Sequence, residues 1–169
     1  MANVNLPNGF QPVLPTNISQ PKITEYVVAA SQTIAKGDAV ILHTDGTVIV
    51  ATATSSGLLG VAASACASAT AGDKIYVYDD PEQIFEAQVA GAIGRTSIYT
   101  TATSSACYDL VATTGGMYVN DSGTTYDIFK IVGFPDRNYF NKNAVNDLDS
   151  AYPRAYVKIN KHLLRPGQI

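Results

Sequence analysis

Short runs of alternating hydrophobic and polar residues cover most of the chain, and they predict a protein built from β-strands. In the run at 84–89, Phe85, Ala87 and Val89 fall on one face and the polar residues between them fall on the other. Similar runs predict strands at 23–30, 39–43, 47–50, 57–63, 75–78, 96–100, 107–111, 117–119, 126–134 and 155–160. Short strands at such close spacing are typical of sandwiches and barrels. We therefore expect an all-β fold, a compact antiparallel domain.

Gly-Asp pairs precede two of these runs, and each run ends at an acidic turn. Gly37-Asp38 leads to Asp45-Gly46, and Gly72-Asp73 leads to Asp79-Asp80-Pro81. A looser third copy begins at Gly115-Gly116. Glycine and aspartate favour tight turns between paired strands. The pattern predicts a body, residues 23–134, made of successive antiparallel hairpins.

The first 22 residues form a different region, predicted to be an extended arm that is not packed as an element. Four of the eight prolines of the chain lie here, and proline removes a backbone donor and favours extended conformation. The region is also apolar, which a disordered tail normally is not. We expect it to lie in a groove of a partner, with six contact residues: Leu6, Phe10, Pro12, Val13, Leu14 and Ile18.

The last segment, residues 135–169, is basic, with six Lys and Arg residues and three acidic residues, in a chain of net charge −3. Its pattern predicts at most one short helix, near 141–150, before a closing edge strand at 155–160. The outward Lys158 would protect that edge from pairing with another sheet. The tail offers a possible second contact arm, formed by Leu163, Leu164 and Arg165.

Catalytic and metal-binding patterns are weak. The only histidines, His43 and His162, lie in no recognisable catalytic frame, so we predict no enzyme and no cofactor. The acidic clusters at 79–82 and 147–149 supply too few ligands for a predicted calcium site. Cys66 and Cys107 are far apart in the sequence, and we interpret them as free thiols. A disulfide between them is the alternative that the sequence leaves open.

Composition further restricts the partners. Charged residues make up 15% of the chain, against about 25% in typical domains, which favours a surface covered by other subunits or wetted by uncharged polar groups. The basic residues are dispersed and the sequence pI is about 5.2, so we expect no nucleic acid partner. No apolar run approaches the roughly 20 residues that span a bilayer, so we expect no membrane partner.

The opening residues 1–13, which include Gly9-Phe10-Gln11-Pro12-Val13, resemble the start of many tailed-bacteriophage capsid decoration (cement) proteins. The stretches 35–40, 60–62 and 71–75 look like the small β-barrel or β-tulip cores of such proteins. Residues 135–169 match no pattern of that family.

This resemblance implies a virion structural protein on the outer capsid surface, made in the host cytoplasm. The family implies a homo-oligomer, with a trimer favoured, whose arm lies over the major capsid protein and bridges its subunits. The alternative is a phage tail or surface module that binds glycans or the host through the tyrosine-containing loops at 99–105 and 121–126. Deletion of residues 1–21 would separate these two functions.

Overall fold

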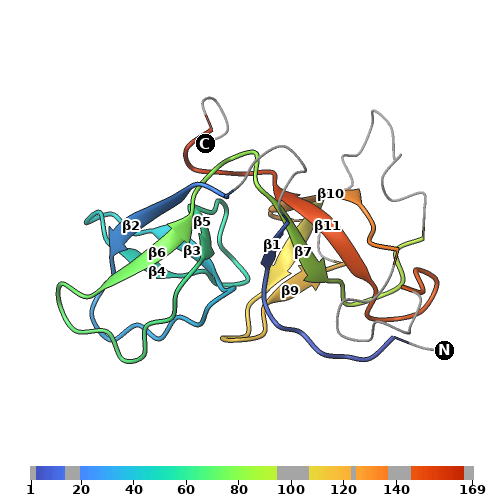
Figure 1. The fold of residues 1–169 in the computed structure, drawn as a ribbon, viewed down its shortest axis with the longest axis horizontal. Coiled ribbons are helices and arrows are strands. Elements are labelled where there is room, and N and C mark those ends of the chain that lie inside the picture. The colour runs from blue at the N-terminus through green and yellow to red at the C-terminus, as the bar shows by residue number, and fades with distance from the viewer. Residues whose placement is uncertain (1–2, 14–19, 95–106, 123–124, 137–145, 166–169) are drawn as a thin grey trace.

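The computed structural model describes residues 3–13, 20–94, 107–122, 125–136 and 146–165, which form two antiparallel sheets side by side (Figure 1). The prediction of an all-β fold is confirmed. The strands are β1 (Gln11–Val13), β2 (Ile23–Val27), β3 (Ala39–Leu42), β4 (Val48–Val50), β5 (Gly60–Ala62), β6 (Lys74–Tyr78), β7 (Ile84–Gln88), β8 (Cys107–Val111), β9 (Tyr118–Asn120), β10 (Phe129–Gly133) and β11 (Arg154–Ile159).

The two sheets share one strand order, which shows an internal duplication. The five-stranded sheet has the order β2-β6-β5-β3-β4, and the six-stranded sheet has the order β1-β7-β11-β10-β8-β9. Adding five to every label of the first sheet gives the last five strands of the second. We call β2 to β6 repeat 1 and β7 to β11 repeat 2. β1 is the additional strand, at the outer edge of repeat 2.

Equivalent residues of the two repeats also share their pairing. Val28, just after β2, forms a parallel bridge with Val48 of β4, and Val89, just after β7, forms one with Val119 of β9. The amide of Ala29 donates to the carbonyl of Val48 at 3.0 Å, and the amide of Ala90 donates to the carbonyl of Val119 at the same distance. Each sheet therefore curls until distant strands meet, although no closed barrel forms among the described residues.

The strand pair β2–β6 of repeat 1 and the strand pair β7–β11 of repeat 2 can be aligned by their registers. This alignment identifies the equivalent residues of the two repeats. Five positions keep the same residue in both repeats: Ile23 and Ile84, Glu25 and Glu86, Val28 and Val89, Tyr76 and Tyr156, and Val77 and Val157. A sixth position keeps its charge, since Lys74 of β6 is equivalent to Arg154 of β11.

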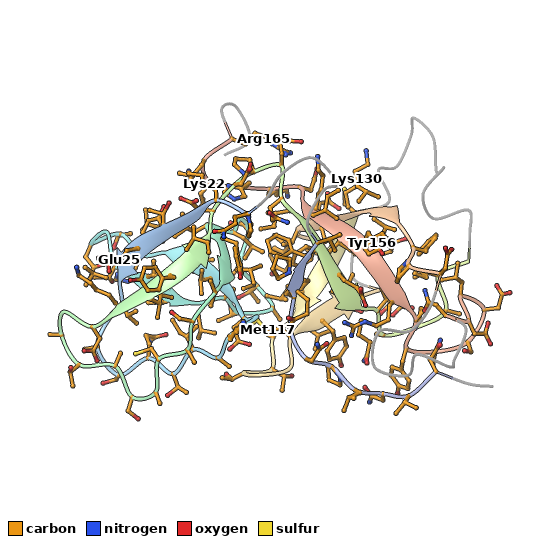
Figure 2. All side chains as sticks on the ribbon, viewed as in Figure 1. Lys22, Glu25, Met117, Lys130, Tyr156 and Arg165 are labelled. Carbon is orange, nitrogen blue, oxygen red and sulfur yellow. The ribbon has the colours of Figure 1, made fainter. Side chains whose placement is uncertain are left out.

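The main hydrophobic core consists mostly of residues of repeat 2, and it also includes Phe10 and a few residues of repeat 1. The ring of Phe10 stacks on Phe129, with 4.6 Å between centroids, and Tyr78 of repeat 1 meets Phe85 of repeat 2 edge-on. Met117 lies at the junction of the sheets, where its sulfur accepts the amide of Ala39 (Figure 2). A second buried cluster belongs to repeat 1 alone.

Several predicted details need correction. The Asp79-Asp80-Pro81 turn does not close a hairpin, because β6 and β7 belong to different sheets. The hairpin after Gly37-Asp38 is found, as β3 and β4. β11 is not an edge strand, since it pairs with both β7 and β10. Lys158 forms an ion pair with Glu82 instead of guarding an edge.

The predicted helix is absent from its described half, residues 146–150, which contains a turn. The other half of that helix and the predicted strand at 96–100 lie outside the described residues. Asn146 explains the turn: its side chain bonds to both the amide and the carbonyl of Arg154, at 2.8 Å each, and so fixes the chain before β11.

Candidate contact surfaces

The described part of the predicted arm, residues 3–13, is extended but packs against its own body. The side-chain amide of Asn3 donates to the carbonyl of Asp147 at 2.6 Å, and the backbone amide of Leu6 donates to Oε1 of Gln88 at 2.8 Å. β1 then pairs antiparallel with β7. The prediction that these residues form no packed element is wrong, because their polar groups find partners on repeat 2.

A close approach of two glycines holds this segment in place. Gly9 has φ of +72°, and a Cβ at this position would lie 2.6 Å from the carbonyl oxygen of Gly37. That carbonyl accepts the amide of Phe10 at 2.8 Å. A side chain at position 9 would meet rigid backbone, so glycine is needed for both conformation and space. Gly37, which lies shortly before β3, therefore holds the N-terminal segment in place through its backbone.

The six residues predicted to contact a partner have different surroundings. Phe10 is 1% exposed and belongs to the main core, so this conformation does not present it to a partner. Pro12 and Val13 are half-buried in β1. Leu6 is 51% exposed, and its unpredicted neighbour Val4 is 62% exposed. Leu14 and Ile18 lie outside the described residues.

The predicted second arm is also attached to the body. The amide of Leu163 donates to the carbonyl of Leu58 at 2.8 Å, and its side chain packs on the core of repeat 1. Arg165 donates to the carbonyl of Pro81 at 2.8 Å and to Glu82 at 2.6 Å, above the junction of the sheets in Figure 2. Leu164 is exposed. Of the three predicted residues, Leu164 alone presents a large apolar surface.

A cavity of about 240 Å³ lies beside β1. Its lining combines residues of the N-terminal segment with both repeats: Gln11, Pro12, Val13, Lys36, Tyr78, Glu86 and Arg154. Arg154 forms an ion pair with Glu86 at 3.0 Å and donates to Oδ1 of Asn8 at 2.9 Å. Burial lowers the pKa of Arg154, and the nearby Glu86 opposes that shift. Sequence reasoning missed this pair.

The acidic residues weighed as calcium ligands bind groups of their own chain. Asp79 accepts the hydroxyl of Tyr26 at 2.9 Å and pairs with Lys22 at 3.2 Å. Burial and this carboxylate raise the pKa of Tyr26 to about 12. No group of three or more His, Cys, Asp or Glu residues that could hold a metal is found within the described part of the chain.

The two cysteines do not pair in the structure: Cys107 is buried, and Cys66 is half-buried. The histidines are separated too. His43 is exposed beside Asp45, whereas His162 is buried where the end of repeat 2 meets repeat 1. The loop at 99–105 lies outside the described residues, and the loop at 121–126 is described only in part.

Neither a protein-family model nor a curated protein matches this chain. Among the described residues, no helix is long and apolar enough to span a membrane. In the part of the chain that the structure describes, seven residues expose a large apolar side chain: Val4, Leu6, Ile23, Val27, Leu42, Tyr76 and Leu164.

Proposed function

We propose that the protein is a virion structural protein that binds the outside of a phage head and stabilises the capsid by bridging major capsid protein subunits. Its likeness to decoration proteins over residues 1–13 supports this function. So does the presence of exposed apolar side chains on an all-β body of low charge. By the same likeness, it acts as a homo-oligomer, with a trimer favoured.

The observation that carries this proposal is the presentation of Val4 and Leu6. Both side chains are more than half exposed, yet hydrogen bonds from Asn3 and Leu6 fix the backbone around them. A contact segment that is already ordered loses less conformational entropy on binding than a flexible one. Repetition of this weak apolar contact around an oligomer raises the total affinity through effective concentration.

The test uses purified protein and expanded, undecorated heads. Deletion of residues 1–21 is a poor test, because it removes Phe10 from the core. The double variant Val4→Asp and Leu6→Asp changes only exposed side chains, and we expect it to lose at least about tenfold in head binding by co-sedimentation. Leu42→Asp, at a similarly exposed leucine of β3, is the matched control. Equal binding by wild type and double variant would contradict this contact, and no binding by wild type would contradict the function.

A further inference from the structure

Repeat 2 carries a cover that includes the N-terminal segment. β1 pairs with the outer edge of β7, with Gln11 opposite Glu86. The preceding residues then lie against the side chains of repeat 2: Gln88 donates to Asn5 at 2.9 Å and accepts from the amide of Leu6 at 2.8 Å. Arg154 donates to Asn8. An uncharged, amide-rich segment thus satisfies the polar groups on this surface.

The equivalent surface of repeat 1 is bare. Its five outward side chains, Ile23, Glu25, Val27, Lys74 and Tyr76, are all exposed. Their equivalents in repeat 2, which are Ile84, Glu86, Gln88, Arg154 and Tyr156, are all half-buried or buried. Ile23, Val27 and Tyr76 are 45%, 39% and 52% exposed, so the bare surface is mainly apolar. We call these five residues of repeat 1 the β2 face.

In the described part of the chain, the edge of β2 that faces away from β6 is unpaired over residues 23–27. β2 ends its sheet, and within the described residues it pairs along its length only with β6. Figure 1 shows it on the outer side of the five-stranded sheet, whereas β7 has β1 beside it. Every second residue of an edge strand directs its N–H and C=O away from the sheet, ready to pair with another strand. The duplication therefore leaves one strand position filled in repeat 2 and open in repeat 1.

The charges on the β2 face indicate what kind of segment fits. Lys74 and Glu25 neutralise each other at 2.6 Å, so a charged partner gains little there. The segment that covers the equivalent pair in repeat 2, residues 3–13, has no charged side chain, and its Asn8 accepts from the cation. Apolar groups on either side of a neutral pair favour an occupant with small apolar residues and side-chain amides.

We infer that the β2 face and the outer edge of β2 bind an extended, uncharged segment of another protein chain, which adds to β2 as an antiparallel strand. Backbone hydrogen bonds to the edge supply affinity, and the side chains of Ile23, Val27 and Tyr76 supply selectivity, as in other cases of strand addition. This inference goes beyond head binding, since it holds for any partner that offers such a segment.

The test is a titration of the full chain with a synthetic peptide of residues 3–13, blocked at both ends. The position of this segment on repeat 2 is already filled, so we expect one molecule to bind at repeat 1 with a dissociation constant below about 1 mM. Amide exchange measured by NMR should slow at residues 23, 25 and 27. Ile23→Lys should weaken binding at least about tenfold, because lysine opposes pairing at a strand edge.

The matched control is Leu42→Lys, which changes a side chain of the same sheet that is 43% exposed and lies outside the β2 face. It should change the affinity less than about twofold. Both substitutions are at exposed positions, and equal melting temperatures would show that the fold is intact.

Any one of four results would overturn the inference. In the first two, the peptide fails to bind, or it binds the Ile23→Lys variant as tightly as it binds wild type. In the third, the peptide replaces β1 on repeat 2, and amide exchange accelerates in β1. In the fourth, the chain alone forms a dimer that the Ile23→Lys substitution dissociates, so that a second copy of the chain occupies the β2 face. None of these results requires phage heads, so failure here is distinct from failure of the proposed function.

Discussion

The two repeats share strand order and register but differ in what covers them, and the ion pairs at their equivalent positions show the effect. In repeat 1 the side chains of Lys74 and Glu25 are 54% and 44% exposed, whereas those of Arg154 and Glu86 in repeat 2 are 2% and 12% exposed. Arginine suits the covered position, because its planar group donates in several directions at once, here to Glu86 and Asn8. One topology thus supports a solvated surface and an internal polar contact.

The most severe test of the difference between the repeats is the removal of Phe10, whose side chain anchors the N-terminal segment on the body. Phe10→Ala deletes a ring that stacks on Phe129 in the main core, and we expect the free energy of unfolding to fall by about 4 kcal/mol. Urea denaturation monitored by circular dichroism measures it. Leu6→Ala, in the same segment but exposed, should cost no more than about 0.5 kcal/mol. Similar small losses for both variants would show that the cover contributes little to stability.

The two equivalent glutamates offer a more direct comparison. Glu86→Gln leaves the buried guanidinium of Arg154 without the negative charge beside it, and we expect a loss of about 3 kcal/mol in the free energy of unfolding. Glu25→Gln removes an exposed pair and should leave the urea midpoint unchanged within error. Equal effects would contradict the different burial of the two pairs.

Strand positions could be predicted from the sequence because alternation is a local signal. The predicted strand at 107–111 coincides with β8, and the run at 84–89 contains β7 with Phe85 and Ala87 buried, as expected. Local patterns do not specify which strands pair. The acidic turns after β3 and β6 looked alike, yet the first closes a hairpin and the second crosses between the sheets.

The five-strand repeat is not evident from the sequence, because the two copies share only a short pattern of residues. The Gly-Asp pairs suggested a repeat of one hairpin, whereas the structural repeat is five strands long. The signal that could have revealed it is the pattern Ile-x-Glu-x-x-Val, present at 23–28 and again at 84–89. The burial of Phe10 had no local signal, because its partner Phe129 is distant in the sequence and the prolines around Phe10 indicated only an extended chain.

The attachment of repeat 2 to repeat 1 predicts a smaller, pH-dependent effect. His162 lies in a parallel bridge with Leu58 of repeat 1, and its Nδ1 accepts the amide of Leu164 at 3.1 Å. Its neutral ring therefore carries the proton on Nε2. Burial, helped by the positive charge of Arg165, lowers the pKa of His162 to about 4. Protonation of Nδ1 would remove the acceptor and place a charge in the junction.

The sign of the effect follows from proton uptake. Between the unfolded pKa of about 6.5 and the folded value, the unfolded chain binds more protons at this site, so stability rises with pH. The contribution of His162 is complete above about pH 6.5 and is lost as the pH falls toward 4, by at most about 3 kcal/mol. Urea unfolding of His162→Gln, which keeps a neutral acceptor, should show a flatter profile than wild type over this range. His43→Gln, at the exposed histidine of repeat 1, should keep the wild-type profile, and a flattening there instead would locate the titration outside the junction.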